Sequence, residues 1–179
     1  MPDRNYDVID LLLAQHDRIK DTLHQVQLAV GTDKQQWFDE LVRLLAVHES
    51  AEGEVVHPAS RRHTVSDDIV EDRLHEEANA KQTLVELHEL GVDHPEFNAK
   101  FGAFAYKVVE HAEAEEKQEF AQLLAQTSAA ERAQLASAVR FAESVAPARP
   151  HPGVGQAPPA KHRAWGKTVE AISQEGRNQ

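Results

Sequence analysis

The pentapeptide His-x-x-Ala-Glu occurs twice in this chain, at residues 48–52 and 111–115. A further histidine precedes each copy by roughly one helix length, His16 before the first copy and His75 before the second. Residues four apart lie on the same face of an α-helix, so each copy directs an imidazole and a carboxylate to one side. Such donor pairs on successive helices favour a bundle with a two-metal site inside it. Because histidine and glutamate are abundant in this chain, the position of each pentapeptide must also be considered.

The periodicity of the apolar residues is helical up to about residue 145, and no alternating strand pattern occurs. The expected helices cover residues 7–30, 32–57, 66–91, 95–127 and 128–145. Gly31 is expected to cap the first helix and Thr32 or Asp33 to begin the second. Pro58 and the polar run Ser60-Arg61-Arg62-His63 are expected to end the second helix. The apolar stripes of the first two helices are Val8, Leu12, Ile19, Leu23 and Val26, then Trp37, Leu41, Leu44 and Leu45. Long helices joined by short turns predict an all-α, up-down-up-down four-helix bundle with an additional C-terminal helix and tail.

The chain divides into a bundle with its fifth helix at 1–146, a proline-rich linker at 147–160 and a tail at 161–179. Five of the eight prolines and two glycines fall in the linker, a composition typical of an extended segment. Within the tail, Trp165, Val169 and Ile172 would share one side of a short helix. This helix could pack loosely on the bundle or bind a partner.

Composition excludes several classes of protein. The chain has no cysteine, which excludes disulfides, thiolate zinc sites and iron–sulfur clusters. Its acidic start resembles neither a signal peptide nor a transmembrane helix, so a cytoplasmic protein is expected. A net charge of −11 without a basic block disfavours nucleic acid and anionic membranes as partners. The sequence indicates no oligomeric state.

We expect four of the histidines to lie at one level of the bundle: His16, His48, His75 and His111. Counted from turns near residues 31 and 93, which up-down topology places at the same end, they lie roughly 22–27 Å along their helices. His16, His48 and His111 also follow the apolar stripes of their helices, whereas the neighbours of His75 are polar. Four imidazoles and two carboxylates in one layer satisfy one another best around metal. A hydrogen-bonded layer without metal is the alternative.

Nitrogen and carboxylate donors without sulfur suit iron, manganese or zinc, and four histidines with two carboxylates favour a dinuclear site with iron foremost. The pattern His16, His48-x-x-x-Glu52, His75, His111-x-x-x-Glu115 resembles the hemerythrin-like HHE cation-binding family over residues 6–145. That resemblance implies a four-helix bundle with two iron ions bridged by oxo or hydroxo. Its implied ligands are His16, His48, Glu52, His75, His111 and Glu115, with the two glutamates bridging.

The chain departs from the oxygen-carrying members of that family in three ways. Asn79 stands where a fifth histidine is found in those proteins, and Glu115 stands at +4 instead of an aspartate at +5. His57 replaces an aromatic residue. In a regular helix His57 would point away from Glu52. Pro58 disfavours the α conformation at the residue before it, and a helix irregularity near Gly53 could turn His57 toward the site. His57 is therefore either a surface residue at a helix end or a further ligand or hydrogen-bond donor at the metals.

Two smaller expectations concern other polar residues. Glu49 is expected to be a solvated acid, with a role beside the metal site as the alternative. The remaining histidines fit no common layer and are expected at the surface: His24, His63, His88, His94, His151 and His162.

The expected function is a non-heme di-iron protein that binds or reduces a small oxidant such as O₂, H₂O₂ or NO. Whether the protein turns over peroxide, in a catalase-like reaction, is left open by the sequence. The alternative is an iron or oxygen sensor that binds without turnover. A metal-storage or structural site is a third class, and it is the least favoured because the expected site is small and internal.

Overall fold

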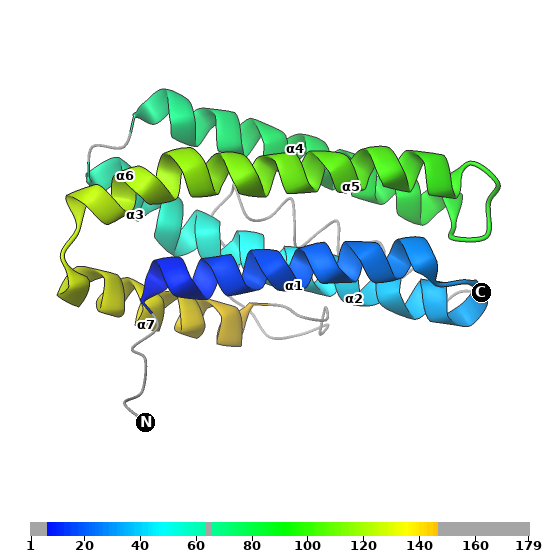
Figure 1. The fold of residues 1–179 in the computed structure, drawn as a ribbon, viewed down its shortest axis with the longest axis horizontal. Coiled ribbons are helices and arrows are strands. Elements are labelled where there is room, and N and C mark those ends of the chain that lie inside the picture. The colour runs from blue at the N-terminus through cyan, green and yellow to red at the C-terminus, as the bar shows by residue number, and fades with distance from the viewer. Residues whose placement is uncertain (1–6, 64–65, 147–179) are drawn as a thin grey trace.

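A computed structural model describes residues 7–63 and 66–146, and every regular element within them is a helix (Figure 1). In chain order the elements are α1 (Val8–Leu28), α2 (Gly31–Ala51), η1 (Glu52–Val56), α3 (His57–Arg62), α4 (Asp67–Leu90), α5 (Phe97–Ala114), η2 (Glu115–Phe120), α6 (Ala121–Gln126) and α7 (Ala129–Val145). The two η elements are π-helical turns.

Two of the bundle helices contain a π-helical turn. Segments α2, η1 and α3 follow one another without interruption, as do α5, η2 and α6. Together with α1 and α4 they form four antiparallel bundle helices, and α7 packs along α1, α2 and η1 (Figure 1). The predicted all-α, up-down-up-down bundle with a further C-terminal helix is confirmed.

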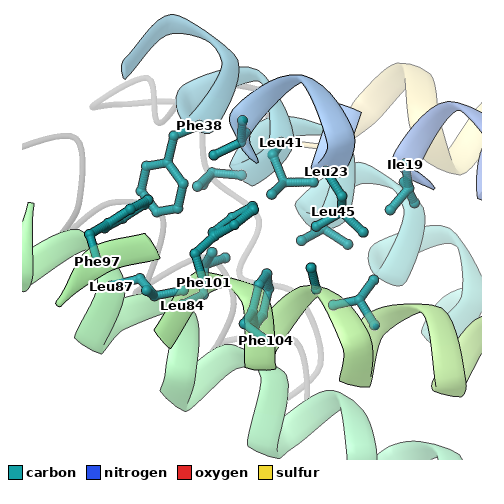
Figure 2. Packing of buried hydrophobic residues seen from close by; sticks show 14 of the residues in the cluster. Ile19, Leu23, Phe38, Leu41, Leu45, Leu84, Leu87, Phe97, Phe101 and Phe104 are labelled. Carbon is teal, nitrogen blue, oxygen red and sulfur yellow. The ribbon is translucent and has the colours of Figure 1, made fainter. Parts of the chain in front are cut away.

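The interior consists of two apolar clusters with a polar layer between them. One cluster surrounds Phe38, Phe101 and Leu84, near the α1–α2 and α4–α5 turns (Figure 2). The other surrounds Leu12 and Phe120 and includes the buried face of α7. On three of the bundle helices, buried histidines or glutamates lie between the residues of the two clusters, and on α4 the buried Glu77 precedes the first cluster's Leu84. The helices therefore place their polar side chains at one level of the bundle.

The predicted stripe of the first helix is buried throughout, whereas that of the second is buried at Leu41 and Leu45 but not at Trp37. Phe38 is 1% exposed and faces the core, while Trp37 is 38% exposed. The predicted caps near Gly31 were also wrong. Helix α1 ends at Leu28, and Gly31, with a φ of +58°, is already the first residue of α2. Glycine suits this position because other residues rarely adopt positive φ.

The second bundle helix ends within the predicted polar run, at Arg62, but Pro58 lies inside the helix and does not end it. The π-helical turn η1 precedes it, and Pro58 occupies the first turn of α3. The helix consequently continues to Arg62 and carries His57 and Ser60 into the interior.

The other predicted boundaries agree with the structure more closely. Ser128 caps α7 through a capping box with Glu131, and Gly91, with a φ of +84°, ends α4. No helix among residues 7–63 and 66–146 is both long and apolar enough to cross a membrane. The predicted linker and tail helix lie outside the described residues.

Candidate metal centre

The polar layer contains two overlapping groups of possible metal donors. Within each group, one ligand atom from every residue lies within 4.8 Å of the others. The first group is His16, His48, Glu52 and Glu115, and the second is Glu52, Glu77, His111 and Glu115. Glu52 and Glu115 belong to both groups. The arrangement therefore offers two adjacent cation positions with two carboxylates in common.

The imidazoles of this layer point their Nε2 atoms at the shared carboxylates. The Nε2 atom of His48 is 3.3 Å from Glu52 Oε1. The Nε2 atoms of His16 and His111 are 3.3 and 3.5 Å from Glu115 Oε2. Each histidine thus presents the same ring nitrogen to the interior.

The opposite ring nitrogens are held by hydrogen bonds to acceptors farther out. The Nδ1 atoms of His16, His48 and His111 donate to Glu116 at 2.8 Å, Gln15 at 2.7 Å and Glu76 at 2.7 Å. Such acceptors fix the tautomer of a histidine and leave its other nitrogen with a lone pair for a metal. The protein therefore orients three imidazoles as metal donors.

All three of these outer acceptors are themselves held by neighbouring side chains, and Lys20 donates to Glu116 at 3.4 Å. Gln15 donates to Glu143 of α7 at 2.5 Å, and Arg73 donates to Glu76 at 2.9 Å. Helix α7 is thereby connected to His48 through the side chain of Gln15. The network extends the site from the bundle interior to α7.

Several buried nitrogen and oxygen atoms of the layer have no hydrogen bond, which indicates that the layer fits a metal. Both carboxylate oxygens of Glu52 and of Glu115 are buried without a hydrogen bond, as are His16 Nε2 and His111 Nε2. A buried polar atom without a partner costs several kcal/mol, and a bare buried charge costs more. Here these atoms converge on one layer, and their chemistry is that of iron, manganese or zinc ligands. A metal would satisfy atoms that the described part of the chain leaves without partners.

Burial and neighbouring charges shift the pKa values of the histidines and glutamates in the layer. Burial, reinforced by repulsion from His16, lowers the pKa of His48 to about 3. Burial acts in the same direction on His111, but Glu115 and Glu76 outweigh it and raise the pKa of His111 to about 9. Burial would raise the pKa of Glu115, yet His111 and His16 hold it at about 2. Burial and the charge of Glu115 raise the pKa of Glu52 well above its ordinary value.

Metal binding is therefore expected to release protons. In the metal-free protein His111 is protonated below its pKa of about 9, whereas a metal requires the neutral ring. Binding at pH 7 should expel this proton, and the part of the release due to His111 should vanish above pH 9. Metal affinity should accordingly rise with pH up to that point. Calorimetric titration with Zn²⁺ in buffers of different ionisation enthalpy measures the release. Equal release at pH 7 and above pH 9 would contradict this assignment.

Each His-x-x-x-Glu unit runs directly into a π-helical turn that begins at its glutamate. Glu52 begins η1 and Glu115 begins η2. In η1 the backbone N–H of His57 donates to the carbonyl of Glu52, five residues earlier. A turn with this spacing brings His57 back to the side of Glu52, and π-helical turns are frequent at functional sites. The irregularity expected near Gly53 is therefore present.

His57 is buried beside the two donor groups. It is 3% exposed, and its Nε2 and Nδ1 atoms lie 2.7 Å from Glu77 and 2.9 Å from Glu119. Ser60 donates to the same Glu119 at 2.6 Å. His57, Glu115 and Glu119 form a third group of possible donors. Burial opposes protonation of His57, but Glu119 and Glu77 raise its pKa well above the ordinary value.

The structure brings most of the predicted site residues together and leaves one out. The predicted residues that meet in the layer are His16, His48, Glu52, His57, His111 and Glu115. His75 is exposed on α4 and belongs to none of the donor groups, so the prediction that it faces the site was wrong. Glu77 enters from α4 in its place, and neither Glu77 nor Glu119 was predicted.

The smaller expectations had different outcomes. Glu49 is buried and lies 3.7 Å from the Nζ atom of Lys81, so it is not a solvated acid. The other described histidines lie outside every donor group, as expected: His24, His63, His88 and His94.

Two cavities approach the layer. The larger, of about 490 Å³, reaches His16, His48, Glu77 and His111. The smaller, of about 380 Å³, lies beside His57 and Glu77 between η1, α3 and α4. The candidate site is therefore bordered by a cavity on either side of Glu77.

The bundle and its buried donor layer define a cation-binding helical protein. Residues 7–141 match the model of the family described as the Hemerythrin HHE cation binding domain. This chain belongs to that family. Its fold is similar to the crystal structure of a hemerythrin HHE cation binding domain-containing protein from Mycobacterium kansasii, with a TM-score of 0.70. The likeness covers 77% of this chain and 85% of that chain at 18% identity, and no curated protein matches the sequence.

Proposed function

We propose that this protein is a non-heme di-iron protein that binds or reduces a small oxidant such as O₂, H₂O₂ or NO. The observation that supports it most directly is the sharing of Glu52 and Glu115 by two donor groups. A carboxylate has two oxygens and can face two cations at once. The family assignment supports cation binding independently.

The charge of the layer supports metal binding at the two shared carboxylates. Glu52 and Glu115 are fully buried, and Glu77 and Glu119 almost completely so. Buried charges require compensation by opposite charges or metals. His57 compensates Glu77 and Glu119, with which it pairs, so Glu52 and Glu115 are the carboxylates whose charge is left for metal.

Iron is proposed over manganese and zinc because of the chemistry it supplies. Two adjacent iron ions, when bound, could exchange two electrons with a small oxidant. The protein itself would orient His16, His48 and His111 as donors through their outer acceptors. His57 would keep Glu77 and Glu119 in position, and the phenyl ring of Phe120, stacked on His16 at 5.5 Å, covers one side of the site.

The test is metal analysis of the freshly purified full chain, a visible spectrum, and peroxide turnover. The proposal expects two irons per chain, charge-transfer absorption, and a spectral change on adding H₂O₂ or NO. Purified protein that carries no iron, takes up none on reconstitution, or shows no response to either oxidant would overturn it.

A sensor without turnover is the second candidate, and the link to α7 favours it. Glu143 of α7 holds Gln15, and Gln15 holds His48. Loss of metal would release His48, and the change could be transmitted through Gln15 and Glu143 to the outer face of α7. Hydrogen exchange of α7 and of residues 147–179, with and without metal, distinguishes the two functions. Metal-dependent protection with no peroxide turnover would favour the sensor.

Replacing His57 with alanine is expected to keep two metals but to alter the site. Glu77 and Glu119 would lose their common partner, and a broken buried pair costs about 3–5 kcal/mol. We expect shifted charge-transfer bands, altered peroxide or azide kinetics, and a lower melting temperature of the metal-free protein. His24→Ala, at an exposed histidine of α1, is the control. If the spectrum, kinetics and stability of His57→Ala all match those of the control, His57 has no role at the site.

A further inference from the structure

The larger cavity is an elongated channel. Its lining residues run along α4 from Glu76 to Leu87 and along α5 from Lys100 to Ala112. At 1.5 Å per residue, these spans correspond to roughly 16–18 Å along the bundle axis. From α1 and α2, only short segments around His16 and His48 contribute. The cavity is therefore enclosed by four helices at one end and bordered by α4 and α5 along its length.

The enclosed end of this channel is the donor layer. His16, His48, Glu77 and His111 all line it. His16 is 2% exposed, and its Nε2 atom, like that of His111, has no hydrogen bond. At the other end the lining includes the exposed residues Glu86, Lys100 and Ala103. The channel thus leads from the surface to polar atoms that require a partner.

The walls between the two ends are largely apolar. The apolar residues of this stretch include Ile19, Leu45, Ala80, Leu87, Phe104 and Val108. Asn79, Thr83 and Lys107 also line it, so a molecule lying in the channel would meet mainly apolar surface with a few polar groups beside it. This distribution matches an apolar body with one polar end.

The volume is much greater than a diatomic molecule requires. A water molecule occupies about 30 Å³ in the liquid, and O₂ or H₂O₂ is of comparable size. The cavity of about 490 Å³ instead falls within the range of roughly 300–1,000 Å³ that holds organic ligands. Access of a small oxidant alone does not account for an apolar space of this size.

We propose that the channel binds an elongated amphiphile, an alkyl or aryl body that carries one oxygen-containing end group. The body lies along Phe104, Leu45 and Val108, and the end group reaches the donor layer. The inference rests on the proposed function insofar as the end group would meet bound metal. Binding of the apolar body depends on the channel walls alone, so it persists in the metal-free protein.

The test uses 1-octanol as the probe and ethanol as its short counterpart. Calorimetric titration of the full chain, metal-loaded and metal-free, is expected to show saturable binding of octanol and none of ethanol. In the loaded protein octanol should also shift the visible spectrum. No saturable binding of octanol to either form would overturn the proposal.

Two substitutions place the probe in the channel. Ala80→Phe fills the channel midway along α4, and Ala103→Phe obstructs its exposed end on α5. Each is expected to weaken octanol binding at least tenfold and to leave the metal content unchanged. If Ala80→Phe does not fold, Ala103→Phe alone tests the assignment. The matched control is Ala78→Phe, at an exposed position of α4 outside the channel lining. Its affinity for octanol is expected to stay within twofold of that of the unaltered protein. Affinity unchanged in both channel variants would overturn the assignment.

The outcomes for the channel and for the metal site are separable. Octanol binding that depends on Ala80 in a protein that takes up no iron would retain the channel and reject the di-iron function. Two irons with a peroxide-sensitive spectrum, but no octanol binding, would retain the function and reject the channel ligand.

Discussion

Glu115→Gln is expected to reduce the metal content of the purified protein from two ions per chain to almost none. Glu115 belongs to all three groups of possible donors and is fully buried. Its Oε2 atom lies close to the Nε2 atoms of both His16 and His111. The amide keeps the shape of the side chain but removes the charge and one acceptor oxygen, so both cation positions lose a donor.

The expected loss of metal affinity is large. Removing an outer partner of a metal ligand already costs roughly 10–100-fold in affinity, and the loss of a shared donor should exceed that. Competition with a chelator and elemental analysis measure the effect, with circular dichroism as a check of the fold. Glu113→Gln is the matched control because Glu113 is exposed on the same helix. Two ions per chain and an unchanged spectrum in Glu115→Gln would show that the shared position is not the metal site.

The level of the site could be predicted from the sequence because helices advance by a constant rise. Counting from the turns placed His16, His48 and His111 in one layer, and the structure brings them together. Errors of one or two residues at helix ends, such as the early end of α1, shift a level by only a few ångström. Helix order and depth therefore withstand small errors in the boundaries.

The rotation of a helix about its axis is more sensitive, and here α4 was misread. Each residue turns the direction of a side chain by about 100°, so His75 and Glu77 differ by roughly 200°. The first part of α4 is polar on most sides and shows no clear apolar stripe. The buried residues Val70 and Leu84 nevertheless lie seven positions before and after Glu77. This heptad spacing is the signal that could have identified Glu77.

The π-helical turns account for the other residues that sequence reasoning placed poorly. A regular helix would turn His57 away from Glu52, and only the extra residue of η1 corrects its direction. The second π-helical turn, η2, begins at Glu115 and includes Glu119. Neither turn has a strong propensity signature, and for η1 the sequence offered only Gly53 and Pro58 as signs of an irregularity. Positions beyond each His-x-x-x-Glu unit therefore required the structure.

Glu77→Gln and His75→Gln together form the test that separates the structural assignment from the sequence pattern. Glu77→Gln is expected to weaken one of the two cation positions by at least about 10–100-fold, because Glu77 belongs to only one of the two groups that share Glu52 and Glu115. The glutamine oxygen can still accept from His57, so the packing of the layer is kept. His75→Gln alters an exposed side chain of the same helix and should leave both ions in place.

Metal titration of the two variants under identical conditions gives the answer. One tightly bound ion in Glu77→Gln and two in His75→Gln would identify the carboxylate as the donor that α4 contributes. The site would then contain three histidines and three glutamates, instead of the four histidines and two glutamates that the family pattern implies. The opposite result, with metal lost from His75→Gln and retained in Glu77→Gln, would mean that α4 turns His75 inward when metal binds, and the assignment of Glu77 would be withdrawn.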